Sequence, residues 1–242
     1  MKNNKSRNSD VRPHCAAIIA AAGSSERMAG EDKLFLEICG APVLAHTLAV
    51  FQRCKAIGEI VVVTRENRID TVCGICAKYG IDKATKVMVG GKTRLESALI
   101  GALAVSDRAE LIAIHDGARP CVSEAIIESA VNAAANCHAS APAVKVSSTI
   151  KRASGGLVTE TVDREDLHEI QTPQVFTAEL IKAALTNAMN KSINVTDDCM
   201  AVEILGFPVH LTEGSGSNIK ITLPEDLIVA KALLEAIRVE VF

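Results

Sequence analysis

The stretch AAIIAAAGSSERMAGEDK, residues 16–33, decides the fold of this chain. Its first seven residues, 16–22, are all apolar, which is typical of a strand covered on both faces of a parallel sheet. A Gly/Ser turn beginning at Gly23 follows, and such a turn lets backbone N–H groups approach an anion closely. Arg27 and Lys33 then offer a planar guanidinium and a mobile ammonium to phosphate oxygens. The stretch therefore predicts a buried strand followed by a loop that cradles a triphosphate.

Beyond this stretch, apolar runs of strand length alternate with helical patterns. Strands are predicted at residues 16–22, 59–63, 87–89, 111–115 and 143–146, and helices from residue 42 and at 69–79, 96–105 and 125–137. This alternation predicts an α/β fold with a doubly wound, mostly parallel sheet. Ligands bind such sheets beyond the carboxyl ends of the strands. Gly23, the Gly90-Gly91 pair and Asp116 all fall there.

In the second half of the chain, strand and helix patterns no longer alternate regularly. Residues 148–161 predict a β-hairpin that turns at Gly155-Gly156 and projects as an arm. Helices are predicted at 177–189, 197–205 and 224–237, and short strands at 209–213 and 218–222. Without internal repeats or a low-complexity linker, residues 14–242 are predicted to form one domain, preceded by a disordered polar tail at 1–13.

Composition limits the possible partners. A net charge of −3 gives no electrostatic reason to bind nucleic acid or a membrane surface, and an aromatic content of 2% argues against platforms for base stacking. The apolar run near the N-terminus is better explained as the first strand than as a signal peptide, and no stretch is long enough to span a bilayer. We therefore predict a cytoplasmic protein with no nucleic-acid or membrane partner.

Eight scattered cysteines, mostly within apolar runs, support the cytoplasmic prediction, because they are typical of reduced, buried thiols. Cys73 and Cys76 form a C-x-x-C pair without a second pair at zinc spacing. Core packing is favoured for them, with a redox or metal role as the alternative.

The segment Gly90-Gly91-Lys92-Thr93 superficially resembles a phosphate-binding P-loop. The P-loop pattern needs a glycine where this chain has Lys86, so the match fails. A G-x-G-x-x-G fingerprint is also missing after the first strand, which argues against dehydrogenases. Two interpretations of the Gly-Gly pair stay open: a simple turn, or a turn whose backbone lies against a flat ligand.

Two acidic positions also carry alternatives. Asp116 directly follows a buried strand and can hold Mg²⁺ against phosphate oxygens, although an aspartate before Gly117 can also simply form a turn. The metal role is favoured. The sequence Thr161-Val162-Asp163-Arg164, taken alone, predicts a helix start with Asp163 as the N-cap.

Six motifs, in order and at family spacing from about residue 15 to 236, make the chain resemble the 2-C-methyl-D-erythritol 4-phosphate cytidylyltransferase family. They are A-A-G-x-x-x-R-M, G-G-x-x-R-x-x-S, H-D-x-A-R-P, T-V-D-R, T-P-Q and N-I-K-x-T. The resemblance implies a Rossmann-like nucleotidyltransferase that transfers CMP from CTP to 2-C-methyl-D-erythritol 4-phosphate in isoprenoid precursor synthesis. A ribitol-5-phosphate cytidylyltransferase is the alternative, and a non-catalytic nucleotide-binding module is a more remote one.

The resemblance also implies roles for individual residues. The catalytic residues would be Arg27, Lys33, Arg164 and Lys220. Contacts to CTP would come from Ala21, Ala22, Gly23, Gly91 and Ser97. Contacts to the acceptor would come from Arg119, Thr149, Arg164, Thr172 and Lys220, and Mg²⁺ would bind Asp116. Arg164 would reach the site from a partner subunit, which predicts a homodimer formed through the arm.

Overall fold

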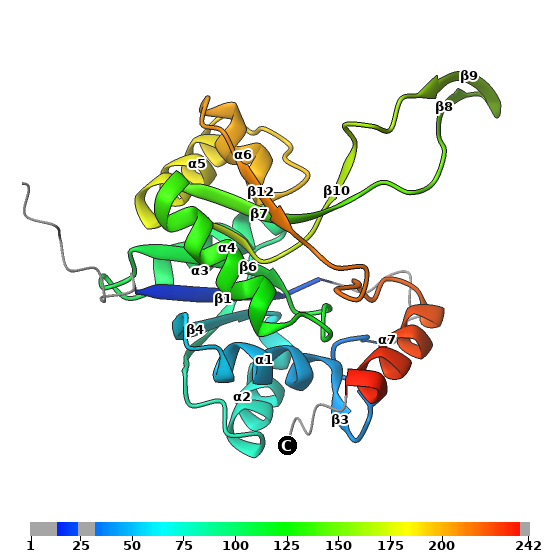
Figure 1. The fold of residues 1–242 in the computed structure, drawn as a ribbon. Helices are drawn as coiled ribbons and strands as arrows, with labels where there is room; N and C mark the ends of the chain where they lie inside the picture. The colour runs from blue at the N-terminus through cyan, green and yellow to red at the C-terminus, as the bar shows by residue number, and fades with distance from the viewer. Residues whose placement is uncertain (1–13, 24–31, 238–242) are drawn as a thin grey trace, which may run out of the picture.

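The computed structural model describes residues 14–23 and 32–237 (Figure 1). Two predictions lie outside the described residues: the polar tail at 1–13 and the position of Arg27. Within the described ranges, no helix combines the length and the apolar character needed to cross a bilayer.

The fold is built on an eight-stranded sheet. Its strand order is β10-β7-β11-β6-β1-β4-β5, and β12 pairs with β7. The strands are β1 (Cys15–Ala21), β4 (Ile57–Thr64), β5 (Ala84–Val89), β6 (Leu111–Asp116), β7 (Ala139–Lys145), β10 (His168–Ile170), β11 (Gln174–Thr177) and β12 (His210–Glu213). Strand β1 lies between β4 and β6 and is parallel to both, so the apolar run that begins the chain is a buried central strand, as predicted.

Helices cover both faces of the sheet (Figure 1). Successive residues of β1 point to opposite faces, so Ile19 packs into one core and Ile18 into the other. The Ile19 core includes residues of α1 (Val43–Arg53), α2 (Ile69–Lys78), α4 (Glu124–Cys137) and α7 (Pro224–Ile237). The Ile18 core includes residues of α3 (Arg94–Ala104), α5 (Ala178–Asn190) and α6 (Asp198–Ile204). The predicted doubly wound architecture is confirmed.

A β-hairpin projects from the body of the molecule (Figure 1). Strands β8 (Ile150–Ser154) and β9 (Leu157–Val162) form their own two-stranded sheet. Gly155 and Gly156 connect them with φ angles of 57° and 82°, the left-handed region that two-residue hairpin turns require. The hairpin predicted at 148–161 is therefore present.

A further small ribbon, β2 (Glu37–Ile38) with β3 (Ala41–Pro42), precedes α1.

The sheet is less regular than predicted on one side. Strand β7 begins at Ala139, four residues before the predicted start, and β11 was not predicted at all. Strand β11 runs antiparallel between β6 and β7, and β10 continues the antiparallel pairing along β7. The sequence signal was weak because β11 has only four residues and β7 is rich in small side chains.

Two predicted elements are wrong. Residues 218–222 form no strand, because their backbone bonds lead elsewhere: the carbonyl of Asn218 accepts from Arg119 Nη1 at 2.6 Å, and the N–H of Ile221 donates to the carbonyl of Ala118 at 2.9 Å. Asp163 does not begin a helix. Its Oδ1 accepts from the N–H of Glu165 at 3.0 Å and closes a turn instead.

Candidate functional site

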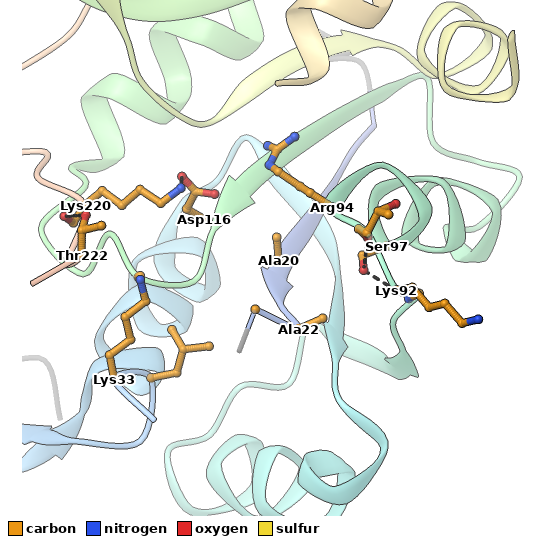
Figure 2. A pocket seen from close by; sticks show the side chains of 14 residues that line it. Ala20, Ala22, Lys33, Lys92, Arg94, Ser97, Asp116, Lys220 and Thr222 are labelled. Atoms are coloured by element: carbon orange, nitrogen blue, oxygen red, sulfur yellow. Dashed lines mark hydrogen bonds and ion pairs between the residues drawn. The ribbon is translucent and has the colours of Figure 1, made fainter. Parts of the chain in front are cut away.

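A cavity of about 560 Å³ opens at the carboxyl ends of β1 and β6 (Figure 2). Among the predicted site residues, its lining contains Ala22, Gly23, Lys33, Gly91, Ser97, Asp116 and Lys220. These residues come from segments spread over almost 200 positions of the chain, and the sheet brings them to one edge. A site at this edge is what a doubly wound sheet predicts.

Asp116 is the charged centre of the cavity. Its Oδ2 lies 2.9 Å from Lys220 Nζ and 3.4 Å from Arg119 Nε, and its backbone N–H donates to Thr172 Oγ1 at 3.1 Å. Burial by itself raises the pKa of the Asp116 carboxyl, but the charges of Lys220, Arg94 and Arg119 outweigh it and hold the pKa below its ordinary value. The group is therefore an anion at neutral pH.

Thr172 and His115 form a hydrogen-bonded chain that leads to the backbone N–H of Asp116. The carbonyl of Arg119 lies 3.4 Å from His115 Nε2 and can only accept, so Nε2 of the neutral ring carries the proton. His115 Nδ1 then accepts from Thr172 Oγ1, 3.1 Å away, while the same Oγ1 accepts from the Asp116 N–H. Burial lowers the pKa of His115 to about 3, so the ring is neutral. Thr172 is itself buried and does not line the cavity, and its predicted contact with an acceptor stays a prediction.

Two lysines reach the cavity from opposite ends of the sequence (Figure 2). Lys220 meets Asp116, and Lys33 Nζ donates to the carbonyl of Ile221 at 2.7 Å. The Ile221 N–H is bonded to Ala118, in the loop that follows Asp116. The segment around Lys220 is thus tied both to the β6 loop and to Lys33, and both lysines line the cavity.

The Gly90-Gly91 turn packs closely against the first strand. A Cβ built on Gly90 would lie 2.7 Å from Ala22 Cβ and 2.9 Å from Ser97 Oγ, so a larger residue would push the turn away. Ser97 Oγ accepts from the Gly91 N–H at 3.2 Å and donates to the carbonyl of Thr93 at 2.9 Å. Gly91 and Ser97 both line the cavity, so this turn forms one of its walls.

Arg94 is a cavity residue to which sequence reasoning assigned no role. Its Nη1 and Nη2 bind Asp198 Oδ1 and Oδ2 at 2.9 and 2.6 Å, and Asp198 is buried. Burial alone lowers the pKa of Arg94, but Asp198 raises it above its ordinary value, whereas burial raises the pKa of the Asp198 carboxyl. The two-point contact between guanidinium and carboxylate fits an ionised pair. Gln174 Oε1 accepts from the N–H of Asp198 at 3.0 Å and fixes the start of α6. The motifs around Arg94 and Asp198 were visible, but their pairing across 104 residues was not.

The other predicted residues that the structure describes lie outside the cavity lining. Ala21 is buried in the core, and Arg119 is buried beneath Asp116. Thr149 and Arg164 are exposed at the base of the arm, where Arg164 Nη1 donates to the carbonyl of Ser147. Neither lines the cavity of the single chain, and their predicted contacts with the acceptor stay predictions.

The fit to Mg²⁺ rests on Asp116. In the described part of the chain, no group of three or more His, Cys, Asp or Glu side chains is arranged to hold a metal. Magnesium, however, is commonly held by one or two carboxylates together with phosphate oxygens of the substrate. The ion pairs of Asp116 with Lys220 and Arg119 both fall on Oδ2, and Asp116 lines the cavity. One carboxylate thus fits a metal that a bound triphosphate would complete.

A doubly wound sheet whose carboxyl edge carries two lysines, an arginine and an ionised aspartate fits an α/β enzyme that binds phosphate groups, such as a nucleotidyltransferase. Comparison with known proteins supports this class and narrows it. The family model described as 2-C-methyl-D-erythritol 4-phosphate cytidylyltransferase matches residues 15–236. The chain belongs to this family.

Curated relatives and solved structures agree with the family assignment. The 2-C-methyl-D-erythritol 4-phosphate cytidylyltransferase of Halalkalibacterium halodurans is 45% identical over 220 residues, covering 90% of this chain and 96% of the relative. That of Clostridium novyi is 44% identical over 225 residues, covering 92% and 97%. The crystal structure of 4-diphosphocytidyl-2C-methyl-D-erythritol synthase from Anaerococcus prevotii aligns with a TM-score of 0.82 at 34% identity, covering 93% of this chain and all of that one.

Proposed function

We propose that this chain transfers CMP from CTP to 2-C-methyl-D-erythritol 4-phosphate, giving 4-diphosphocytidyl-2-C-methyl-D-erythritol and pyrophosphate in isoprenoid precursor synthesis. The observation that carries the proposal is the meeting of Lys33, Asp116 and Lys220 on one cavity in a chain that belongs to this family. A triphosphate and a second phosphate are strongly anionic, and this cavity offers the cations to hold both.

The chemistry needs positioning more than proton transfer. A phosphate oxygen of the acceptor attacks the α-phosphorus of CTP, a new P–O bond forms, and the bond from the α-phosphorus to the bridging oxygen breaks to release pyrophosphate. The nucleophile is already an anion, so no general base is needed. Lys33 and Arg27 stabilise the charge on the α-phosphate and on the leaving pyrophosphate. Lys220 holds the acceptor phosphate.

Asp116 is proposed to hold Mg²⁺ through its carboxylate, which is ionised and lines the cavity. When bound, the ion supplies charge neutralisation to the triphosphate. Lys220 and Arg119 stay within reach of the same carboxylate and keep it ionised.

The wall formed by the Gly90-Gly91 turn is proposed to receive the cytosine. Cytosine differs from uracil in hydrogen-bond polarity at its N3/N4 edge, and backbone groups and the Ser97 hydroxyl can distinguish the two. Ala22 and Gly23 line the cavity next to this wall and are proposed to contact the nucleotide as well. Ala21 is buried in β1, so its proposed contribution to CTP binding is through the shape of that strand and not through direct contact.

The arm is proposed to form a homodimer in which Arg164 and Thr149 reach the partner's cavity and bind the acceptor. Two observations support it: both residues are exposed away from their own cavity, and Leu157 and Val158 next to the hairpin turn are 75% and 62% exposed. Two large apolar side chains at the tip of a hairpin that projects into solvent favour burial against another surface. A cytoplasmic location is also proposed, supported by eight free cysteines.

The deciding experiment mixes the purified protein and Mg²⁺ with each of the four nucleoside triphosphates and either 2-C-methyl-D-erythritol 4-phosphate or ribitol 5-phosphate, and follows pyrophosphate release. We expect release only with CTP and the methylerythritol substrate. Release with ribitol 5-phosphate alone would keep the chemistry and change the acceptor. A folded protein that binds CTP but releases no pyrophosphate in any mixture would contradict the proposal.

A further inference from the structure

Lys33 lies in a segment whose backbone is hydrogen-bonded at the residue before it and at the residue after it. The N–H of Phe35 donates to the carbonyl of Asp32 at 2.9 Å, and the N–H of Leu44 donates to the carbonyl of Leu34 at 2.9 Å. Leu34 is buried, and Phe35 packs against the same core. The Lys33 side chain extends from this anchored segment into the cavity (Figure 2).

The Asp32 carboxylate forms ion pairs with two arginines that follow strand β4. Its Oδ2 accepts a hydrogen bond from Arg65 Nη2 and lies 3.3 Å from Arg68 Nε. Arg65 directly follows β4, and Arg68 ends the short helix η1 (Glu66–Arg68). The Arg68 guanidinium also lies over the Phe35 ring, 4.9 Å from its centroid. We call Asp32, Arg65 and Arg68 the arginine clamp.

The arginine clamp is poorly suited to a purely stabilising role. The Asp32 side chain is 10% exposed, and the described chain offers no hydrogen-bond partner to its Oδ1 or to the Nε atoms of Arg65 and Arg68. The side chains of Arg65 and Arg68 are 31% and 36% exposed, so the desolvation cost falls mainly on the buried Asp32 carboxylate with its unsatisfied oxygen, and ion pairs do not always repay that cost. The arginine clamp fixes the position of Asp32 relative to the carboxyl end of β4. Asp32 directly precedes Lys33 in the chain.

We propose that the arginine clamp is a positioning device for Lys33, and this inference rests on the proposed role of Lys33 in transfer. A lysine is a point charge on a flexible stem, so its use at one phosphorus atom depends on a fixed Cα. Displacement by about 1 Å can cost a hundredfold in rate. Arg65 and Arg68 act through Asp32 and need not touch either substrate.

The test is a double-mutant cycle with Asp32→Asn, Lys33→Ala and the combined variant. Turnover and the KM for CTP are measured by pyrophosphate release with CTP, Mg²⁺ and 2-C-methyl-D-erythritol 4-phosphate. We expect Asp32→Asn to lower kcat at least tenfold with the KM for CTP changed less than threefold, and to add less than threefold in the Lys33→Ala background. Arg65→Gln should reproduce the loss. Glu124→Gln, which removes the exposed ion pair with Arg53, is the matched control and should leave kcat unchanged.

Hydrogen–deuterium exchange supplies a readout that is independent of activity. We expect the backbone amides of residues 33–36 to exchange at least tenfold faster in Asp32→Asn than in the wild type or in Glu124→Gln. Unchanged exchange there, or the same loss of kcat in the presence and absence of Lys33, would overturn the positioning role. A wild-type protein that releases no pyrophosphate would overturn the proposed function instead, and the exchange rates would still decide whether the clamp holds the segment.

Discussion

Lys220 Nζ lies 2.9 Å from Asp116 Oδ2 although 104 residues separate them, and the contact joins the last irregular segment of the chain to the end of strand β6. The pair lies at the cavity rather than in the core, because the Lys220 side chain is 41% exposed. Asp116 therefore holds a lysine at the cavity, and its carboxylate is the group that we propose binds Mg²⁺.

Asp116→Asn should abolish metal-dependent turnover. The amide keeps the size of the side chain but removes the charge that opposes Lys220 and Arg119, and amides bind Mg²⁺ weakly compared with carboxylates. We expect kcat to fall by at least two orders of magnitude, with a raised Mg²⁺ requirement in a titration of pyrophosphate release. Wild-type turnover at low Mg²⁺ would remove Asp116 from the metal site.

Lys33→Ala should lower kcat about a hundredfold or more, since losing one preorganised charge at a developing anion costs roughly 3–4 kcal/mol of barrier. The thermal unfolding midpoint should stay close to that of the wild type. Lys191→Ala, at an exposed position after α5, is the control. Near-normal turnover of Lys33→Ala would exclude the residue from the transfer step.

Lys220→Ala should act on the acceptor. We expect the KM for 2-C-methyl-D-erythritol 4-phosphate to rise at least tenfold, while the dissociation constant of CTP, measured by calorimetry, changes little. The physical reason is the loss of one charge-assisted contact to phosphate. An unchanged acceptor KM together with an unchanged kcat would show that the assignment is wrong.

His115 should make the fold sensitive to acid. The unfolded chain takes up a proton at an ordinary histidine pKa of about 6.5, whereas burial lowers the native pKa to about 3, so the native state binds fewer protons between these values. Stability is therefore fully present above pH 6.5 and is lost as the pH falls toward 3. His115→Gln should reduce the loss of unfolding free energy between pH 6.5 and 5 by roughly 2 kcal/mol, as measured by urea denaturation. His210→Gln, at an exposed position, is the control.

Arg164 should act in trans. Arg164→Ala and Lys33→Ala are each expected to be nearly inactive alone, and mixing them after dissociation and reassociation should restore turnover, because one cavity of a mixed dimer keeps both residues. A sedimentation run at micromolar concentration should show a dimer. A monomer there, or no recovery on mixing, would contradict the shared site.

The amino-acid sequence by itself determined the local elements and the chemical inventory. The apolar run of β1, the glycine pair of the arm and the bounds of α7 followed from patterns within a few residues. Seven of the residues that line the cavity were predicted from motifs, because each motif is local.

Tertiary structure alone decided which motifs meet. The pairing of Arg94 with Asp198, the support of Asp116 by Thr172 and the grip of Arg65 and Arg68 on Asp32 all join distant segments. The short strand β11 and the irregular path of residues 218–222 were missed for the same reason. Short-range patterns fix which face of a strand or helix is apolar, whereas ion pairs and hydrogen bonds across the sheet depend on strand order, which no local pattern encodes.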